Sequence, residues 1–263
     1  MTSLHVQFGD ALPPTLATLE IGSGRVTTDS ANGVVRLTIR AEDAQHYHDA
    51  QLWDYARLTH KEFPDRAPLQ MTIRARFSHQ ADALRGTAGF GFWNQPVMPN
   101  QWLPRLPRYC WFFFGSPPTN MKFDLATPGS GWKAATLDMS RWLFLLLAPF
   151  TPIGFLLMRI PALYRALWPV AQRIIGVAEQ TISVDLREWH SYRLTWRTDG
   201  CQFFVDDQLL LETATAPRGA LGFVAWIDNQ FAVVTPQGQL GMGLLAAPDE
   251  QWLEIASLDI RPL

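Results

Sequence analysis

Short segments in which apolar and polar residues alternate recur along most of this chain, and they limit the folds that it can form. The clearest is residues 69–77, where every second residue is apolar over nine positions. Side chains alternate between the two faces of a strand, so this period of two indicates a strand with one buried face. Asn32-Gly33, a typical hairpin turn, precedes a similar segment at residues 34–40. Further strands are predicted at residues 89–93, 110–114, 181–185, 191–196, 201–205, 209–212, 222–227 and 253–260.

Many short strands with turns between them, and no regularly alternating helices, predict an all-β sandwich or jelly roll. We expect residues 1–263 to form one such domain, because all-β sandwiches reach this length as single units. With 22 basic and 24 acidic residues and 48% hydrophobic residues, the chain has neither the low hydrophobicity of a disordered protein nor the basic excess of a nucleic-acid binder. No nucleic-acid partner is therefore predicted.

One segment, residues 139–177, differs from the rest and is predicted to be an insert in the sandwich. Residues 142–158 contain no charged residue, but two prolines and a glycine interrupt them. A membrane-spanning helix needs about 20 apolar residues, so this run is not expected to form a simple transmembrane helix. The residues that follow, with Arg159, Arg165 and Arg173, fit a cationic amphipathic helix that Pro161 should begin and that Pro169 should kink or split. At about 100° per residue, the arginines and Gln172 fall within one arc of roughly 140°, and Leu163, Leu167, Trp168, Val170 and Ile174 occupy the rest.

The insert has a net charge of +4, from four arginines and no acidic residue, whereas the rest of the chain has −6. Such a cationic apolar segment suits the surface of an anionic membrane. Two alternatives remain open, namely packing of the insert against its own domain and a homo-oligomer interface. The residues predicted to contact the membrane are Trp142, Phe144, Phe150, Phe155, Arg159, Arg165, Trp168 and Arg173.

Cellular location follows from two further features of the sequence. Residues 1–10 lack a basic region followed by an apolar run, so no secretory signal is predicted. Cys110 and Cys201 form neither a disulfide framework nor a metal-ligand pattern, and each lies among aromatic residues, as buried free thiols do. We expect a cytoplasmic protein that lies at the inner membrane face if the insert binds lipid.

The sequence also resembles a known family. Residues 189–196, which begin Trp-His-Ser-Tyr, and the following Val205-Asp206-Asp207 resemble the late strand pair of family 16 glycoside hydrolases, the laminarinase-like enzymes, with Asp207 in place of the usual glycine. Residues 37–39, Tyr47 and residues 69–77 and 89–94 follow a similar order. The resemblance covers residues 30–120 and 180–263 and implies a concanavalin-A-like jelly roll, a fold that serves both glycosidases and non-catalytic lectins.

The catalytic signature of that family is missing. Its strand presents Glu-x-Asp-x-x-Glu, and retaining hydrolysis needs two carboxyl groups about 5–5.5 Å apart. None of the glutamates in this chain has an aspartate two positions later, and residues 110–115, where the motif is expected, read Cys-Trp-Phe-Phe-Phe-Gly. Standard retaining glycosidase chemistry is therefore not expected.

Candidate ligand-binding residues lie at strand ends and on aromatic strands. Trp93 and Asn94 end one strand and are expected to supply an aromatic platform with a polar group, although a core position for Trp93 is equally open. Asp228 and Asn229, which follow an apolar strand, are the leading functional pair. The sequence does not say which face of residues 110–114 lines a groove. The predicted ligand-binding set is Tyr47, Trp93, Asn94, Trp111, Phe113, Trp226, Asp228 and Asn229.

His46 and His48, beside Asp49 and Asp54, form the most metal-like cluster, since residues two apart on a strand face the same way. Two histidines without a third ligand do not define a site, so neither a metal nor another cofactor is predicted. Lys133 follows a glycine-rich loop and is expected to be solvated. Candidate acids or bases for catalysis are Asp228, Asp54 and His48.

Three functions are consistent with these features, and the first is favoured. In the first, the protein is expected to bind a glycan, a glycolipid or another amphiphile in an aromatic groove at a membrane surface, because aromatic faces suit sugar rings and lipid chains alike. Alternatively, the same groove belongs to a noncanonical isomerase, cyclase or hydrolase for an amphiphilic substrate. The third alternative is a structural or oligomerising protein. Whether the chain is an enzyme is left open.

Overall fold

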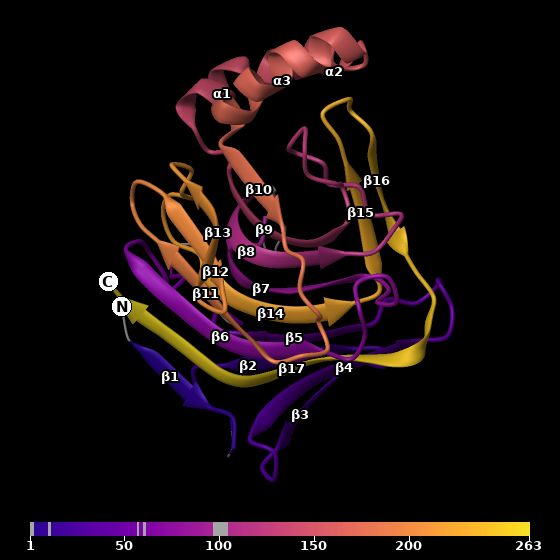
Figure 1. The fold of residues 1–263 in the computed structure, drawn as a ribbon, viewed down its shortest axis with the longest axis vertical. Coiled ribbons are helices and arrows are strands. Elements are labelled where there is room, and N and C mark those ends of the chain that lie inside the picture. Colours follow the sequence, from indigo (N-terminus) through magenta and orange to yellow (C-terminus); the bar gives the residue numbers. More distant parts are fainter. Residues whose placement is uncertain (1–2, 10–11, 57, 60–61, 97–104) are drawn as a thin grey trace.

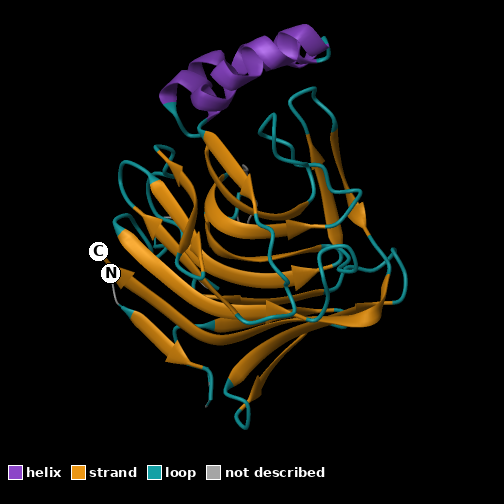
Figure 2. Ribbon diagram, in the orientation of Figure 1, coloured by secondary structure: helices purple, strands orange, loops and turns teal. Residues whose placement is uncertain are grey.

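The computed structural model describes residues 3–9, 12–56, 58–59, 62–96 and 105–263. Two large antiparallel sheets pack face to face, and three short helices lie at one end of the molecule (Figures 1 and 2). The predicted all-β sandwich is therefore confirmed.

The outer sheet contains eight strands, and its two central strands come from opposite halves of the chain. Residues 69–77, predicted from their alternation, form β6, which pairs with the C-terminal strand β17. In spatial order the strands are β13 (Gln208–Thr213), β12 (Cys201–Val205), β11 (His190–Trp196), β6 (Leu69–Phe77), β17 (Ala247–Pro262), β4 (Val34–Ala41) and β3 (Arg25–Asp29), and β1 (Leu4–Gln7) also pairs with β17.

The inner sheet contains seven strands and curves beneath the helices (Figure 1). A separate hairpin of β15 (Gln230–Val234) and β16 (Leu240–Leu244) rises from one side of it toward the helices. The order of the inner sheet is β10 (Val177–Thr181), β9 (Gly131–Asp138), β8 (Arg108–Gly115), β7 (Thr87–Trp93), β14 (Gly222–Asp228), β5 (Asp49–Trp53) and β2 (Ala17–Ile21).

Aromatic residues dominate the core between the two sheets. Phe90 and Phe112 from the inner sheet meet Tyr192 from the outer sheet, with ring centroids 5.0 and 5.2 Å apart in edge-to-face geometry, an arrangement that aromatic pairs favour. Cys110 and Cys201 lie in the same core as free thiols, as predicted. Every second residue of β7 and β8 is therefore committed to the core, and the intervening residues face the concave side.

Three parts of the sequence prediction for strands were wrong or incomplete. The strand predicted at residues 181–185 lies earlier, as β10, and ends at Thr181. Strands β1, β2, β3, β5, β9, β15 and β16 were not predicted; β5 is nearly all buried, and β9 begins in a glycine-rich segment that resembles a loop. Lys133 lies within β9 and is buried, so the expectation of a solvated lysine was wrong.

The helices connect β9 to β10, which are antiparallel neighbours in the inner sheet. They are α1 (Trp142–Leu147), a short 3₁₀ turn (Ala148–Phe150), α2 (Thr151–Met158) and α3 (Pro161–Ile175). Pro161 occupies the first turn of α3, as predicted, but α3 continues through Pro169 as one helix, so the helix is not split there. Among the described residues, we find no helix with the length and apolar character needed to cross a bilayer.

Candidate functional site

The concave face of the inner sheet carries a continuous aromatic surface. Trp111 and Phe113 on β8 face this side, whereas Phe112 and Phe114 face the core, which answers a question that the sequence leaves open. Trp111 stacks on Phe113 with ring centroids 5.6 Å apart, and it lies 5.2 Å from Trp226 on β14. Tyr109 stacks on the other side of Trp111 at 4.2 Å. Together these rings form a broad apolar platform.

Strand β7 lies between the strands that carry these rings, and it contributes glycine where they need room. Gly89 pairs with both Phe113 and Trp226 across the sheet, and Gly91 pairs with Trp111. A Cβ atom on Gly89 would lie 2.2 Å from the carbonyl oxygen of Phe112 and 3.0 Å from the Trp226 ring. The alternation of glycine and phenylalanine in β7 thus allows large rings to close over it on the concave side.

Polar groups gather at one end of this platform. Asp228 on β14 pairs directly with Asp49 on β5, so the two carboxyl groups share one face of the sheet. One carboxylate oxygen of Asp228 accepts hydrogen bonds from the backbone and hydroxyl of Thr87, at 3.2 and 2.7 Å, and from the backbone of Gln230 at 3.1 Å. The Tyr47 hydroxyl donates to the other oxygen at 3.4 Å.

Burial raises the pKa values of both acids, and the Asp228 charge further raises that of Asp49. Burial raises the pKa of Asp228 to about 6, while the hydrogen bonds from Thr87 and Gln230 oppose this rise. Burial and the neighbouring Asp228 charge raise the pKa of Asp49 to about 8, and one buried oxygen of Asp49 has no hydrogen-bond partner in the described part of the chain. The pair therefore holds about one negative charge near neutral pH. An arrangement of this kind can exchange a proton or orient a hydroxyl group.

We call the cavity beside Asp228 the polar end of the groove. Its volume is about 260 Å³, and it is lined by the rings of Trp93, Trp111, Phe113 and Trp226 and by the polar groups of Tyr47, Gln51, Thr87, Asp228 and Gln230. Six of the eight predicted ligand-binding residues, namely Tyr47, Trp93, Trp111, Phe113, Trp226 and Asp228, thus line one cavity.

A second cavity of about 310 Å³ continues from the first and shares Trp93, Trp111 and Met121 with it. We call it the apolar chamber. It lies between the concave sheet, the helices and the β15–β16 hairpin, and its further lining includes Tyr109, Phe123, Leu137, Phe144, Phe155, Trp168, Ile175, Val234 and Leu240.

Two of the predicted ligand-binding residues, Asn94 and Asn229, hold backbone segments in place. Asn229 is fully buried, and its amide bonds to His48, His46 and Leu245 join three segments of backbone. Asn94 is also fully buried, and its side chain bridges the backbone of Leu106 and Arg108. Both donors and the acceptor of the Asn229 amide are used within the protein, so the prediction that Asn229 binds a ligand was wrong. Asn94 also lines the apolar chamber, and its role in ligand binding stays a prediction.

The structure also separates the proposed catalytic candidates. The His48 ring accepts a hydrogen bond from the backbone of Ser23 at 2.8 Å, and the His46 ring lies 3.2 Å from Asp43. Asp54 follows β5 at the end opposite Asp49, and its carboxyl group holds the backbone of Phe223 at 2.9 Å. His48 and Asp54 therefore do not join Asp228 at the groove. The described residues contain no group of three metal-ligating side chains.

The residues predicted to contact a membrane divide between two faces of the helices. Trp142 and Phe150 are exposed, as are Arg159, Arg165 and Arg173. Phe144 and Phe155 are partly buried and line the apolar chamber.

Trp168 is only 5% exposed, and its indole nitrogen donates to the carbonyl of Phe123 at 2.9 Å, so its assignment to an exposed face was wrong. The helical period placed Trp168 outside the arc of the arginines, but the sandwich occupies that side. Gln172, assigned to the polar arc, bonds to Asp124 and also faces the sandwich.

A buried ion pair that the sequence did not reveal connects the sheet to the helices. The Lys133 ammonium donates to Glu179 at 2.9 Å and to the carbonyls of Met121 and Pro128 at 2.9 and 3.0 Å. The other oxygen of Glu179 accepts from the backbone of Phe123 and Asp124 at 2.9 and 2.8 Å. Trp168 and Gln172 of α3 form hydrogen bonds with Phe123 and Asp124 of this same loop. The ion pair therefore fixes the loop to which α3 is bound.

Comparison with known proteins identifies the fold. No family model matches the sequence, and no curated protein does. A β-1,3-1,4-glucanase (lichenase) derived from a mouse hindgut metagenome is 10% identical with a TM-score of 0.52, and the match covers 100% of both chains. The Bacillus licheniformis β-glucanase is 9% identical with a TM-score of 0.50, over 99% of this chain and 98% of the other. This chain is a concanavalin-A-like jelly roll.

A third similar structure is a GlcNAcα1-4Gal-releasing endo-β-galactosidase from Clostridium perfringens, with 12% identity, a TM-score of 0.54, and coverage of 98% of this chain and 61% of the other. The resemblance to family 16 glycoside hydrolases is thus confirmed as a likeness of fold. In this chain the concave face of β8 carries Tyr109, Trp111 and Phe113.

Proposed function

We propose that this protein binds an amphiphilic ligand, such as a glycolipid, in the concave groove while the outer surface of its helices rests on an anionic membrane. The observation that carries this proposal is the position of the helices. They cover one end of an aromatic groove with their inner side chains and expose a second apolar surface to the outside.

The groove itself suits a ligand with both polar and apolar parts. Trp93, Trp111 and Trp226 present aromatic faces, on which sugar rings and hydrocarbon both pack well. Asp228 and Tyr47 add hydrogen-bonding groups at one end only. The solved structures of similar fold include two proteins named as β-glucanases and one named as an endo-β-galactosidase, and these names refer to glycan substrates. This likeness supports a sugar as the polar part.

The outer helical face is the second support. Leu146 is 61% exposed, and Phe150 and Leu156 are each 60% exposed. Exposed apolar patches of this kind on soluble proteins mark interaction sites. The full set of large apolar side chains exposed on the helices is Trp142, Leu145, Leu146, Leu147, Phe150, Ile153, Leu156, Leu157, Ile160, Leu167 and Val170.

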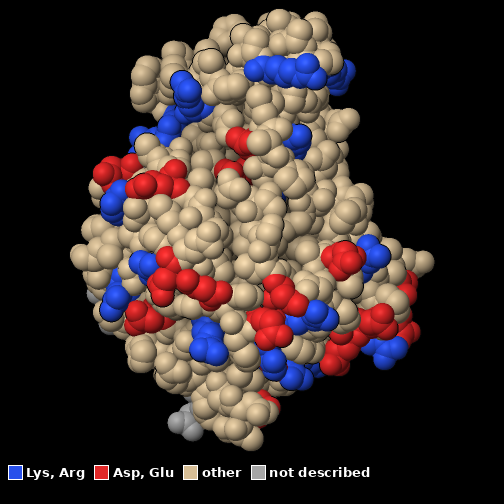
Figure 3. Space-filling view, in the orientation of Figure 1, with Lys and Arg blue, Asp and Glu red and all other residues tan. Residues whose placement is uncertain are grey.

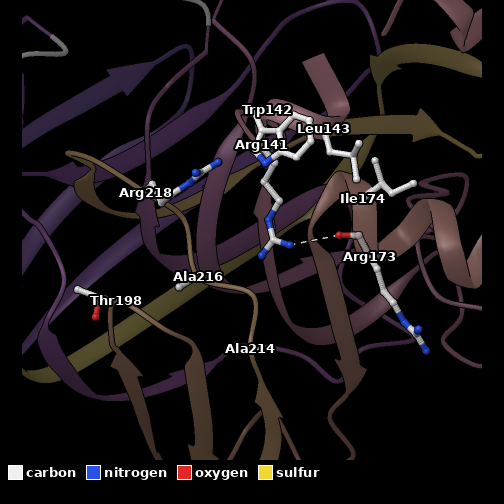
Figure 4. A pocket seen from close by; sticks show the side chains of 9 residues that line it. All are labelled: Arg141, Trp142, Leu143, Arg173, Ile174, Thr198, Ala214, Ala216 and Arg218. Carbon is white, nitrogen blue, oxygen red and sulfur yellow. Dashed lines mark hydrogen bonds between the residues drawn. The ribbon is translucent and has the colours of Figure 1, made fainter. Parts of the chain in front are cut away.

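The charges around this face favour a negatively charged surface as its partner. In Figure 3 the helical end of the molecule shows basic but no acidic side chains, and the acidic residues lie lower. Arg141, Arg173 and Arg218 surround an open hollow beside the base of α1 (Figure 4), where Arg141 donates to the carbonyl of Arg173 at 3.2 Å. Each basic side chain near an anionic bilayer contributes about 1 kcal/mol to binding.

Co-sedimentation with lipid vesicles tests the membrane part of the proposal. We expect the full chain to sediment with vesicles of phosphatidylglycerol and phosphatidylcholine, less so as salt rises and less with phosphatidylcholine alone. A charge on the outer helical face, as in Leu146→Glu with Phe150→Glu, should weaken vesicle binding at least tenfold without lowering the melting temperature.

Leu209→Glu is the matched control, because Leu209 is also exposed but lies on β13, away from the helices. Equal losses for Leu209→Glu and for the helix variant would contradict the proposal. If the wild-type protein ignores vesicles and instead forms a dimer that the helix variant dissociates, the outer helical face is a subunit interface.

A further inference from the structure

The apolar chamber carries an inference about the ligand that is more specific than the proposed function on which it rests. We propose that the chamber holds the hydrocarbon chain of a single-chain amphiphile, whose uncharged, hydroxyl-bearing head group lies against Asp228 and Gln51 at the polar end of the groove. The protein is thus a binder of a neutral lipid-linked hydroxyl compound rather than of a fatty acid or a phospholipid.

The lining of the chamber supports a hydrocarbon occupant. Phe144 and Phe155 from the helices face Leu137 and Trp111 of the sheet across a space of about 310 Å³. The buried Trp168 also lines it, but its indole N–H is already bonded to Phe123. Ligand cavities usually begin near 300 Å³ and are mostly apolar. A polar ligand here would lose its water without gaining hydrogen bonds, whereas an alkyl chain would gain about 0.8 kcal/mol per buried methylene group.

The chamber opens toward the surface that we place on the membrane. Leu240 of the β15–β16 hairpin lines the chamber and is nevertheless 71% exposed, so this side of the chamber reaches solvent. The turn of the same hairpin contacts α2, because Arg159 donates to the carbonyl of Gln237 and Phe155 packs beside Gly238. The opening therefore lies next to the exposed apolar side chains of α2. The hydrocarbon chain of a ligand can thus pass from the bilayer into the chamber without crossing water.

The polar end determines which head group fits. Gln51 is 9% exposed and lines this cavity, and its side-chain amide has no hydrogen-bond partner among the described residues. The Gln230 amide likewise lines the cavity without a side-chain partner in the described chain. Amides both donate and accept, and Asp228 accepts, so hydroxyl groups match this set.

An anionic head group would meet the charge of the Asp49–Asp228 pair in a partly desolvated site, where like charges repel strongly. A quaternary ammonium would gain contacts with the tryptophan faces and with one carboxylate, but it has no hydrogen to donate to the amide oxygens and no oxygen to accept from the amide N–H groups. The uncharged head group is therefore favoured over both.

Three detergents that share a dodecyl chain test the inference on the wild-type protein. Dodecyl maltoside, dodecyl sulfate and dodecyltrimethylammonium are titrated below their micelle concentrations, with calorimetry and tryptophan fluorescence as readouts. We expect dodecyl maltoside to bind at least tenfold more tightly than the other two. Tighter binding of the sulfate or the ammonium would overturn the head-group assignment, and failure of all three to bind would overturn the inference as a whole.

Two neighbouring residues of α2 allow a test of where the hydrocarbon chain of the ligand lies. Phe155 lines the chamber, whereas Leu156 is 60% exposed on the outer helical face. Phe155→Ala should weaken dodecyl maltoside binding about tenfold, equivalent to 1.4 kcal/mol, and leave vesicle binding unchanged. Leu156→Ala should do the reverse.

If Leu156→Ala weakens dodecyl maltoside as much as Phe155→Ala does, the detergent binds the outer face and the chamber assignment is wrong. If maltose alone binds as tightly as dodecyl maltoside, no chain is held in the chamber, although the proposed sugar-binding groove would stand. Vesicle binding measured on the same samples tests the membrane proposal separately.

Discussion

The buried ion pair between Lys133 and Glu179 makes a quantitative prediction about how the helices are held over the groove. The two side chains are 1% and 2% exposed, so solvent does not screen their interaction. Replacing Lys133 with methionine keeps most of the side-chain volume but removes the ammonium group and its three hydrogen bonds. The Glu179 carboxylate would then be buried with only the two backbone N–H groups of Phe123 and Asp124 as partners.

Breaking a buried pair on one side typically costs about 3–5 kcal/mol, because an uncompensated charge remains. We therefore expect Lys133→Met to lower the free energy of unfolding at pH 7 by about that amount, as measured by urea denaturation with an unchanged slope. Lys122→Met is the control. Lys122 lies between Met121 and Phe123 in the loop bound by the ion pair, but it is half-buried and forms no ion pair within the described residues. It should change stability by less than about 1 kcal/mol.

A second measurement connects this ion pair to the helices. Glu179 fixes the loop of Phe123 and Asp124, which in turn binds Trp168 and Gln172 of α3. Amide hydrogen exchange in residues 161–175 should therefore accelerate in Lys133→Met more than exchange in the outer sheet.

The double variant Lys133→Met with Glu179→Gln should lose less stability than the sum of the two single variants, because it leaves no unpaired charge. A loss below 1 kcal/mol in Lys133→Met, or strict additivity in the double variant, would refute the reasoning.

Two further predictions concern the groove. The pKa values of Asp49 and Asp228 are about 8 and about 6 in the folded protein, against about 3.9 in an unfolded chain. The folded state thus binds more protons between about pH 4 and 8, and the free energy of unfolding should fall across this range, by on the order of a few kcal/mol. Urea titrations at several pH values should show this decline in the wild type and a flatter one in Asp49→Asn; an equal decline in both would exclude Asp49 as its source. Because β8 presents Tyr109, Trp111 and Phe113 to the groove, we expect no hydrolysis of laminarin or mixed-linkage glucan with retained anomeric configuration, and reducing sugar together with such a product by NMR would disprove this.

The sequence by itself determined the class of fold and the position of the insert. The alternation in residues 69–77 predicted β6 residue for residue, because a half-buried strand needs one apolar face and the period of two is visible locally. The run without charges at residues 142–158 contains α1 and α2 of the predicted, partly helical insert, and Pro161 marked the start of α3. Local chemistry sufficed for these features, since the signal and the structure involve the same few neighbouring residues.

Only the tertiary structure decided which faces meet and which acids become neighbours. Asp49 and Asp228 are far apart in the chain, and the pairing register of β5 with β14 sets them opposite each other. Trp168 belongs to an apolar helical stripe, but periodicity cannot say whether such a stripe faces solvent, lipid or the protein's own sheet. The sequence predicts a solvated Lys133, whereas the pairing of β9 with β10 buries it beside Glu179. Sequence periods show which residues share a face, whereas the long-range pairing of strands determines what that face contacts.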